Sequence, residues 1–470
     1  MKTRIKSESG GAATSVAAEP DSTPKTKGNN GAVSNAAESV SNDVSRNLSA
    51  IGEMTPERKS QIERGARGLL ESSGIFKSLR RALRRERLVG ELRNALVLYV
   101  VGLSALLDRP LNAIVKGSSS AGKNHLVSRP LRLFPKEAVR EITSSSKTAW
   151  NYGRDDFRHA IVYLQERNDA AGAIHPVRLL ISEGRLIRTV TVNEGGIRVP
   201  KTFVAEGPIA SISTTTRDRI EVDDENRHIS LWMDESREQT RRINERYVSP
   251  QPRLTDDELA TWHQAYALIK ARADVPVKLP DWFTIVATNV FDGSVTSRRY
   301  FPNFVEGCRT IALLRSFEKY PVDQPPREIE VDFSDFAIAT MLFEEVFVES
   351  LDRDGDEHLK TRMAVQEISD ENKGAPVTAE QLAERMSVSM DRAYRLLRDA
   401  VEAELIKRAN EPEKGNAKTY LPAPRPRFIP DPAEMLEEIP EITAPVEFIH
   451  PLTGETIKLR RTKKQKGAIA

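Results

Sequence analysis

The stretch that decides the fold is LNAIVKGSSSAGKN, residues 111–124. Its first part, from Leu111 to Val115, is an apolar run that predicts a buried parallel strand. Gly117 follows, then four residues, and then Gly122 and Lys123. Glycine lets the backbone curl so that consecutive N–H groups point at phosphate oxygens, and the next helix presents its positive end to the same anion. The residues expected to bind a nucleotide are Gly117, Ser118, Ser119, Ser120, Ala121, Gly122, Lys123 and Asn124.

Two features of this phosphate loop are unusual. Lys123 is expected to reach the β and γ phosphates, and a serine or threonine usually follows such a lysine to ligate magnesium. Here that position holds Asn124, whose amide oxygen is the expected metal ligand instead. Pro130 falls early in the expected helix, so we predict that the helix is short or kinked.

A second apolar strand should carry an acidic residue beside the loop. The stretch HAIVYLQER, residues 159–167, has a strand candidate at 160–164 followed by Gln165 and Glu166. In a Walker B motif an Asp orients magnesium and the following Glu polarises the attacking water. Glu166 fits the second role, and Gln165 stands at the metal-orienting position. The alternative is an ordinary buried strand that ends in a charged turn.

The next 50 residues predict a hairpin and another strand. The runs 186–192 and 197–207 flank the turn Asn193-Glu194-Gly195-Gly196, which is typical of a β-hairpin. The basic residues of this hairpin are Arg185, Arg188, Arg198 and Lys201. The apolar run 208–217 then ends in three threonines, whose polar side chains are expected beside Glu166. Arg227 precedes a further apolar run.

This order of motifs resembles the AAA+ ATPases that have a hairpin before sensor 1, such as minichromosome-maintenance and viral superfamily 3 helicases. It is most similar to the ATPase part of primase-helicases of phages and mobile elements. The matching stretches, between about residues 85 and 350, are PLNAIVKGSSSAGKNHL, HAIVYLQE, LLISEGRLIRTVTV, EGPIASISTTTR, ENRHISLWMDES and RRYFPNFVEGCRTIALL. The resemblance implies an α/β core with a parallel sheet and a helical lid, together with ATP and Mg²⁺ as cofactors.

The resemblance also implies a role for individual residues. Glu166 would be the catalytic base, and Thr215 or a neighbouring threonine would be sensor 1. Arg227 would be an arginine finger that reaches the ATP of a neighbouring subunit, which implies a ring of identical chains. Arg298 or Arg299 would be sensor 2 in the lid. Each arginine also has the simpler interpretation of a salt bridge on the surface or in the lid.

A separate region points to DNA without that resemblance. Residues 377–422 have helix-turn-helix patterning followed by two strand-like runs, which is typical of a winged helix. Thr378 is expected to cap the first helix, and Ser387 to Ser389 to form the turn. The second helix would turn Arg392, Arg395 and Arg398 outward, where such side chains contact DNA. A winged helix used for protein contacts is the alternative.

Composition limits the other possibilities. The chain has 70 basic and 68 acidic residues, so a DNA-binding surface requires local clustering of charge. The single cysteine, Cys308, excludes an internal disulfide and a cysteine-based zinc site. The longest apolar run, 95–107, is too short to span a bilayer and predicts a buried helix. A soluble protein of the cytoplasm is therefore expected, with no membrane partner.

Changes in composition divide the chain into seven segments. They are a disordered tail (1–50), a helical N-terminal segment (51–110), the ATPase core (111–250), a helical lid (251–352), a linker (353–376), the winged helix (377–422), and a linker with a basic tail (423–470). The composition of the first segment cannot bury enough surface to offset its ordering entropy. No primase or zinc-binding part is visible, so a separate primase or replication protein is an expected partner.

Two functions remain after this reading of the sequence. The first is an ATP-driven, helicase-like replication protein of a mobile element or phage. The second is a DNA adaptor that binds nucleotide with little turnover. Asn124 and Gln165 motivate the adaptor, because both replace expected metal-coordinating groups. A metabolic kinase would leave the winged helix without a role.

Overall fold

The computed structural model describes residues 55–143, 156–167, 170–217, 220–249, 252–290, 297–354, 357–409, 418–424 and 427–461. The predicted disordered tail, the tip of the predicted wing and most of the closing basic stretch lie outside these residues. Within the described part, no helix is long and apolar enough to cross a membrane.

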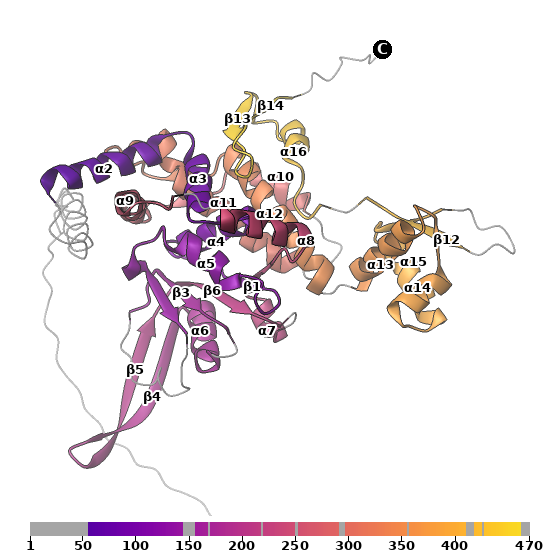
Figure 1. The fold of residues 1–470 in the computed structure, drawn as a ribbon, viewed down its shortest axis with the longest axis horizontal. Coiled ribbons are helices and arrows are strands. Elements are labelled where there is room, and N and C mark those ends of the chain that lie inside the picture. Colours follow the sequence, from indigo (N-terminus) through magenta and orange to yellow (C-terminus); the bar gives the residue numbers. More distant parts are fainter. Residues whose placement is uncertain are drawn as a thin grey trace, which may run out of the picture.

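A five-stranded parallel sheet forms the centre of the molecule (Figure 1). Its order is β2-β3-β6-β1-β7, and every neighbouring pair is parallel. Four of its strands are buried along their whole length, as expected for a sheet that is covered on both faces. The strands are β1 (Ala113–Lys116), β2 (Val139–Ile142), β3 (Ala160–Leu164), β6 (Ile209–Thr215) and β7 (Ile229–Trp232).

The helices before the sheet belong to the same hydrophobic core. Thr55 caps the first helix, with Pro56 in its first turn. The apolar run near residue 100 is a helix buried on all sides, which confirms that prediction. These helices are α2 (Pro56–Glu71), α3 (Ile75–Arg85) and α4 (Leu92–Ser104), and the phosphate loop leads into α5 (Lys123–Leu131), which ends just after Pro130.

Shorter elements connect the strands, and a mainly helical region follows the sheet. The connecting elements are η1 (Lys136–Ala138), α6 (Ala171–Glu183) and α7 (Val222–Glu225), and α8 (Arg237–Val248) follows the last strand of the sheet. The helical region consists of α9 (Asp256–Arg272), α10 (Phe283–Thr288), α11 (Ser297–Lys319) and α12 (Phe333–Asp354), with the short parallel pair β8 (Val277–Lys278) and β9 (Ile329–Glu330). Helix α9 packs along α2, and α11 packs along α12.

The predicted hairpin projects from the edge of this body (Figure 1). Its strands, β4 (Arg185–Glu194) and β5 (Ile197–Glu206), pair over their whole length around a turn at Gly195 and Gly196. Both glycines have positive φ, as a tight hairpin turn requires.

A small unit follows the lid and has its own hydrophobic core. Thr378 caps its second helix, and Ser387 to Ser389 form the turn before the third, as the sequence predicts. Its three strands form an antiparallel sheet in the order β10-β12-β11. The elements are α13 (Glu357–Glu371), β10 (Val377–Thr378), α14 (Ala379–Met386), α15 (Met390–Glu402), β11 (Ile406–Arg408) and β12 (Thr419–Pro422).

Helix α13 corrects one prediction, because residues 353–376 were expected to be a linker. Leu359 is buried in the main core, whereas Val365 and Ile368 are buried in the core of the small unit. Val365 and Ile368, three residues apart, share one side of the helix, whereas Leu359, six residues before Val365, lies about 120° away on another side. The polar residues between them dominate the composition and hid this pattern.

The C-terminal segment corrects a second prediction, since residues 423–470 were expected to be a linker and tail. It contains α16 (Pro432–Glu438) and a hairpin of β13 (Val446–Ile449) and β14 (Thr456–Leu459). Its apolar side chains lie in the main hydrophobic core, and the ring of Phe428 is 5.5 Å from that of Phe347. A high content of Pro and Glu is typical of linkers, but a few well-spaced apolar residues are sufficient for packing.

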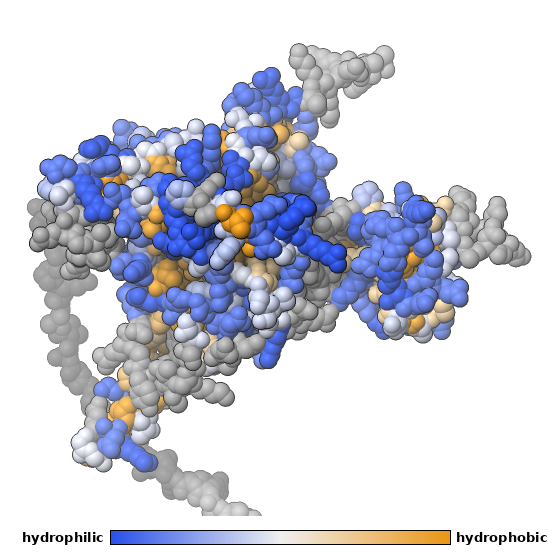
Figure 2. Space-filling model, viewed as in Figure 1, coloured by the Kyte–Doolittle hydropathy of each residue, from blue (hydrophilic) through white to orange (hydrophobic). Residues whose placement is uncertain are grey.

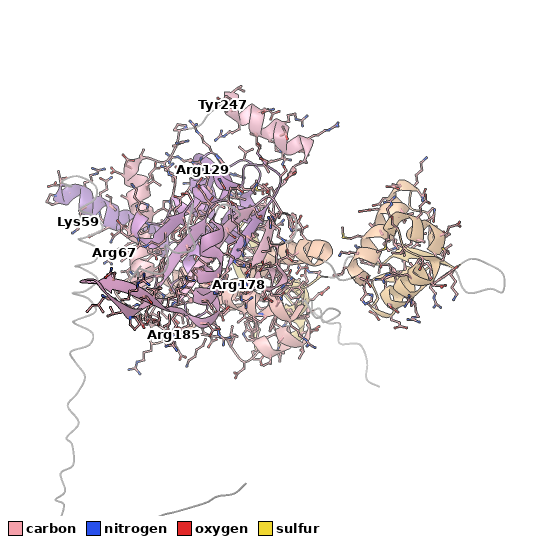
Figure 3. The ribbon with its side chains drawn as sticks, turned by 90° about the horizontal axis from the view of Figure 1, so that it is seen from below. Lys59, Arg67, Arg129, Arg178, Arg185 and Tyr247 are labelled. Atoms are coloured by element: carbon pink, nitrogen blue, oxygen red, sulfur yellow. The ribbon has the colours of Figure 1, made fainter. Side chains whose placement is uncertain are left out.

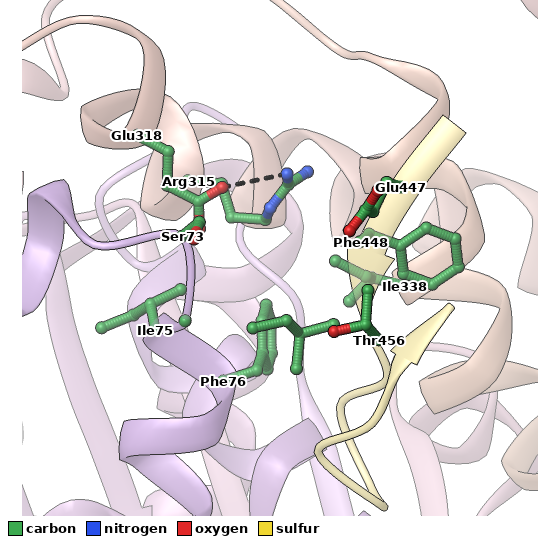
Figure 4. A pocket seen from close by; sticks show the side chains of 11 residues that line it. Ser73, Ile75, Phe76, Arg315, Glu318, Ile338, Glu447, Phe448 and Thr456 are labelled. Carbon is green, nitrogen blue, oxygen red and sulfur yellow. Dashed lines mark hydrogen bonds and ion pairs between the residues drawn. The ribbon is translucent and has the colours of Figure 1, made fainter. Parts of the chain in front are cut away.

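A cavity of about 150 Å³ lies where this hairpin meets α3, α11 and α12 (Figure 4). Arg315 forms an ion pair with Glu318 at its wall, and Phe76 and Phe448 close it from opposite sides. None of its lining residues belongs to the phosphate loop.

Candidate nucleotide site

The phosphate loop connects the end of β1 to the start of α5. Ser120 and Gly122 have φ values of 71° and 88°, in the left-handed region. A residue in this conformation turns successive N–H groups toward one point, which creates a concavity for an anion. Serines 118–120 are exposed, so a ligand can reach the loop.

Lys123 lies at the first position of α5 and its side chain is buried. Its ammonium group donates to the carbonyl of Gly117 at 3.1 Å and to that of Ser118 at 2.9 Å. The same nitrogen is 4.0 Å from a carboxylate oxygen of Glu166. The side chain therefore folds over the loop, with its positive charge between the loop and the acidic residue after β3.

Glu166 is held in an unusual backbone conformation. Its φ is 45°, which costs a non-glycine residue about 1 kcal/mol or more. Its backbone N–H donates to the hydroxyl of Thr214 at 2.9 Å, and the N–H of the next residue, Arg167, donates to the carbonyl of Thr214 at 2.8 Å. These bonds fix the carboxylate at the carboxyl edge of the sheet, next to Lys123.

Thr214 is the threonine at the centre of this cluster. Its hydroxyl donates to the amide oxygen of Asn124 at 3.1 Å and accepts from Glu166. The hydroxyl of Thr215 instead accepts from the backbone of Arg217 at 3.2 Å. The sequence predicted a polar tip beside Glu166 and put Thr215 first, although a neighbouring threonine was left open. Because successive residues of a strand point to opposite faces, only the strand register can distinguish Thr214 from Thr215.

Tyr163 was missed by the sequence analysis. Its hydroxyl donates to the amide oxygen of Asn124 at 3.2 Å. Burial raises the pKa of Tyr163, so the hydroxyl stays protonated and acts as a donor. The only signal in the sequence is its position in strand 160–164, two residues before Gln165.

The two expected metal ligands have different surroundings. The amide oxygen of Asn124 faces the loop cluster but already accepts two hydrogen bonds, from Tyr163 and Thr214. The amide of Gln165 donates to Glu141 on β2 at 2.6 Å. No group of three acidic, His or Cys side chains that could hold a metal by itself occurs in the described residues. A magnesium ion here would therefore take most of its ligands from phosphate oxygens and water, and Asn124 would have to give up one of its two hydrogen bonds to join them.

Helix α7 is attached to this site by two buried charge clusters that the sequence analysis missed. Lys116, directly before the loop, is fully buried and pairs with Glu225 at 2.8 Å. Asp224 pairs with Arg167 and, at 2.7 Å, with Arg178 of α6. Burial raises the pKa of Asp224, but the two guanidinium groups outweigh this effect and the net shift is downward. Burial, together with the nearby charge of Arg167, lowers the pKa of the neighbouring His228 to about 4.

The predicted arginines of the subunit interface and the lid both lie near α7. Arg227 donates from Nε to Ser182 at 2.7 Å and from its guanidinium group to the carbonyl of Asp223. Arg299 donates to Asn226 at 2.8 Å and to the hydroxyl of Tyr300 at 2.6 Å. Both side chains are half-buried within one chain, and their roles as arginine finger and sensor 2 remain predictions.

The order of elements around the loop identifies the fold. A strand and phosphate loop are followed by a strand with a terminal Glu, a hairpin, and a threonine-tipped strand inserted between the first two. This chain has a P-loop α/β fold with the element order that the resemblance to AAA+ ATPases implies. The α/β core with its parallel sheet and helical lid is therefore confirmed.

Comparison with known proteins adds structures of low similarity. No known protein family and no curated protein matches the sequence. Among solved structures, the Orc1 protein of Aeropyrum pernix in complex with DNA is 15% identical, with 72% of this chain and 90% of that chain covered and a TM-score of 0.23. A RuvB variant of Thermotoga maritima is 14% identical, with coverages of 75% and 96% and a TM-score of 0.24. The C-terminal region of NrS-1 is 12% identical, with coverages of 72% and 76% and a TM-score of 0.24. These scores are low, so the assignment rests on the loop and the strand order.

The predicted DNA-binding residues of the AAA+ core lie on different faces of the hairpin. Arg188 and Lys201 are two pairs apart on one face, with Val190 between them, because Arg188 pairs with Phe203 and Val190 with Lys201. Arg198 lies on the opposite face, where it pairs with Asn193 and is exposed. Of the three predicted DNA-binding residues of the hairpin, Arg188 and Lys201 therefore share a face, and Arg198 does not. Figure 2 shows hydrophobic side chains on this projecting hairpin, of which Ile187 and Ile197 are 53% and 68% exposed.

The three arginines of α15 are all exposed, as the sequence predicts. Arg392 pairs with Glu357 of α13, and Arg398 with its neighbour Asp399 at 2.9 Å. Arg395 donates only to a backbone carbonyl, that of Asp391, at 3.4 Å among the described contacts. Tyr394, on the same outer surface, is 50% exposed. Helix α15 thus presents basic and aromatic groups outward, while Leu397 and its other apolar residues face the core.

Proposed function

We propose that this chain binds ATP at the phosphate loop and hydrolyses it while acting on DNA, as a helicase-like replication protein of a mobile element or phage. The observation that supports this most is the cluster in which hydrogen bonds join Glu166, Thr214 and Asn124 and Lys123 lies 4.0 Å from the carboxylate of Glu166. It combines a phosphate-binding cation, a carboxylate and polar side chains at the carboxyl edge of a parallel sheet, where α/β proteins bind ligands.

Each residue of the cluster has a chemical task in hydrolysis. Lys123 would exchange its two carbonyl partners for the β and γ phosphates. Glu166 would orient the attacking water and accept its proton. Thr214, as the sensor residue, would hold the backbone of Glu166. Magnesium, when bound, neutralises charge on the phosphates, and Asn124 would offer its amide oxygen to it. Gln165 would first have to release Glu141.

Oligomerisation would complete the site in this proposal. Arg227 from a neighbouring copy would reach the γ phosphate, which requires it to leave Ser182 and Asp223. Arg299 would act from the lid of the same chain. The hairpin and α15, within a winged-helix unit, would hold DNA, and a separate primase or replication protein would act with the ring in the cytoplasm.

A nucleotide-binding DNA adaptor with little turnover is the second candidate. The hydrogen bonds of Asn124 and Gln165 favour it, because both side chains already have partners within the protein. In that case ATP would set the assembly state, and α15 would choose the DNA.

Steady-state ATP hydrolysis with magnesium separates the two candidates. We expect turnover that DNA stimulates and that Lys123→Ala and Glu166→Gln each abolish. ATP-dependent DNA binding without turnover, lost in Lys123→Ala, would leave the adaptor. In that case the double variant Asn124→Ser/Gln165→Asp should gain turnover strongly, and the absence of a gain would count against the adaptor.

A further inference from the structure

The segment between β7 and α8, residues 233–236, lies against the phosphate loop. The carboxylate of Glu235 accepts a hydrogen bond from the backbone N–H of Ser118 at 2.5 Å. A Cβ atom built at Gly117 would lie 2.9 Å from Cγ of Met233 and 3.1 Å from the carboxylate of Glu235. Cε of Met233 also reaches 4.0 Å from the corresponding position at Gly122. Met233 therefore spans the loop from one glycine to the other.

A carboxylate that is bound to a phosphate-binding loop competes with the phosphate. The backbone N–H groups of such a loop attract anions, and a carboxylate oxygen accepts the same hydrogen bond as a phosphate oxygen. One N–H group cannot serve both at full strength. A phosphate group would also be repelled by a carboxylate left at this distance.

Neighbouring residues hold Glu235 in this position. The backbone N–H of Asp234 donates to Glu91 at 2.7 Å, and Asn94 donates to the carbonyl of Trp232 at 2.8 Å. On the other side, Ser236 caps helix α8. The segment is thus anchored at both ends, and the contact of Glu235 with the loop is not that of an unattached surface side chain.

Helix α8 begins directly after this contact and is attached to the body mainly at its first turn. Gln239 is its buried residue and donates to the carbonyl of Val89 at 2.7 Å. Tyr247 at the far end is 86% exposed and points away from the body (Figure 3). The first turn of α8, directly after Glu235, is therefore the part of the helix that a buried contact fixes to the body.

We propose that Glu235 is an autoinhibitory ligand of the empty phosphate loop, which nucleotide phosphates must displace before they bind. This inference rests on the proposed nucleotide binding at Lys123. Displacement requires the Glu235 side chain to turn away from the N–H group of Ser118, while Asp234 and Ser236 hold the backbone on either side.

The test is the affinity of the full chain for ADP and for ATP, with and without magnesium, measured by calorimetry. Glu235→Gln keeps the size and the acceptor oxygen but removes the charge, and Glu235→Ala removes the ligand entirely. Glu238→Gln is the matched control, because it removes an exposed carboxylate three residues away that pairs with Arg242. Lys123→Ala reports whether the measured binding is at the loop, and melting curves confirm that each variant is folded.

We expect the Kd to fall by about tenfold or more in both Glu235 variants, because a charge-assisted hydrogen bond no longer competes with the phosphate for the loop. Glu238→Gln should bind like the wild type. Equal gains in Glu235→Gln and Glu238→Gln would overturn the inference, because net charge would explain both. An unchanged or weaker affinity in the Glu235 variants, beside wild-type binding that Lys123→Ala abolishes, would overturn the inference and leave the proposed function. Absence of binding in every variant would overturn both.

Discussion

At the scale of single residues, Thr214 connects three parts of the candidate site. Its hydroxyl bonds Asn124 of the loop and the backbone of Glu166, which otherwise would not keep its positive φ. Removing one buried hydrogen-bonding group costs about 1–3 kcal/mol, and a misplaced carboxylate affects the transition state more than binding.

We therefore predict that Thr214→Val lowers the kcat of ATP hydrolysis by about tenfold or more, with a smaller change in nucleotide affinity. Thr214→Ser should restore most of the loss. Thr215→Val is the control, because the Thr215 hydroxyl bonds only Arg217 among the described contacts. A larger loss in Thr215→Val than in Thr214→Val would return the sensor role to Thr215.

His228 gives a prediction about pH. Its pKa is lowered to about 4 by burial, while an unfolded histidine titrates near 6.5. Between these values the unfolded chain binds the additional proton, so stability falls as the pH falls from 6.5 to 4. The loss from this group amounts to about 3 kcal/mol. Chemical denaturation across this range should show a shallower pH dependence for His228→Gln than for the wild type. The exposed His175, changed to Gln, should leave the dependence unaltered.

The sequence was sufficient for the residues whose chemistry depends on local spacing. The loop and Lys123 follow from a strand, a turn and a helix that are adjacent in the chain, and Glu166 follows from its place just after β3. The partners that complete the site, Tyr163 and Thr214, depend on the register of three strands far apart in the sequence. No local pattern fixes that register.

At the scale of elements, the hairpin of β4 and β5 separates its basic residues into two groups. Arg188 and Lys201 share a face with apolar residues, whereas Arg198 is on the other face. An isolated two-stranded hairpin is marginally stable in water, so a projecting one is expected to gain support from a partner.

If DNA is that partner on one face, the double variant Arg188→Gln/Lys201→Gln should weaken single-stranded DNA binding and lower the salt slope by about one to two. Arg198→Gln should have a clearly smaller effect. Affinity measured at several salt concentrations checks this. Equal losses per charge from both faces would contradict a one-sided contact, and no loss from either would remove the hairpin from the DNA surface.

The C-terminal segment, residues 423–470, was wrongly predicted to be a linker and tail because of its composition. Phe428 is buried between Tyr300 and Phe347, with ring distances of 5.9 and 5.5 Å. We predict that Phe428→Ala lowers the free energy of unfolding by about 3–5 kcal/mol, because it leaves a cavity in a packed core. Tyr247→Ala serves as the control and should change the melting temperature little, because this ring is 86% exposed. If Phe428→Ala melts like the wild type, the segment does not contribute to the core in solution.

At the scale of the whole molecule, the proposed ring predicts that each active site needs residues from two neighbouring chains. Lys123→Ala lacks a nucleotide site but keeps Arg227, whereas Arg227→Ala keeps the site but lacks the finger. Each variant alone should be inactive. A mixture should regain turnover, since about a quarter of the interfaces in a randomly mixed ring would be intact.

The measurement is ATPase activity as a function of the mixing ratio, with sedimentation to confirm that the two variants assemble together. Lys123→Ala mixed with Glu166→Gln is the control and should remain inactive, because both changes affect the same site. Full activity of Arg227→Ala alone would show that Arg227 serves only its contacts with Ser182 and Asp223.

Helix α13 has a consequence for movement within the proposed ring. Leu359 is embedded in one core and Val365 in the other, about 9 Å further along the same rod. A flexible linker would not pass a rotation of the lid on to the small unit. A helix that is packed into both cores would pass it on. A rotation of α12 and its neighbours that also rotates α13 would change the orientation of α15. The angle at which α15 meets a duplex would then follow the rotation of the lid.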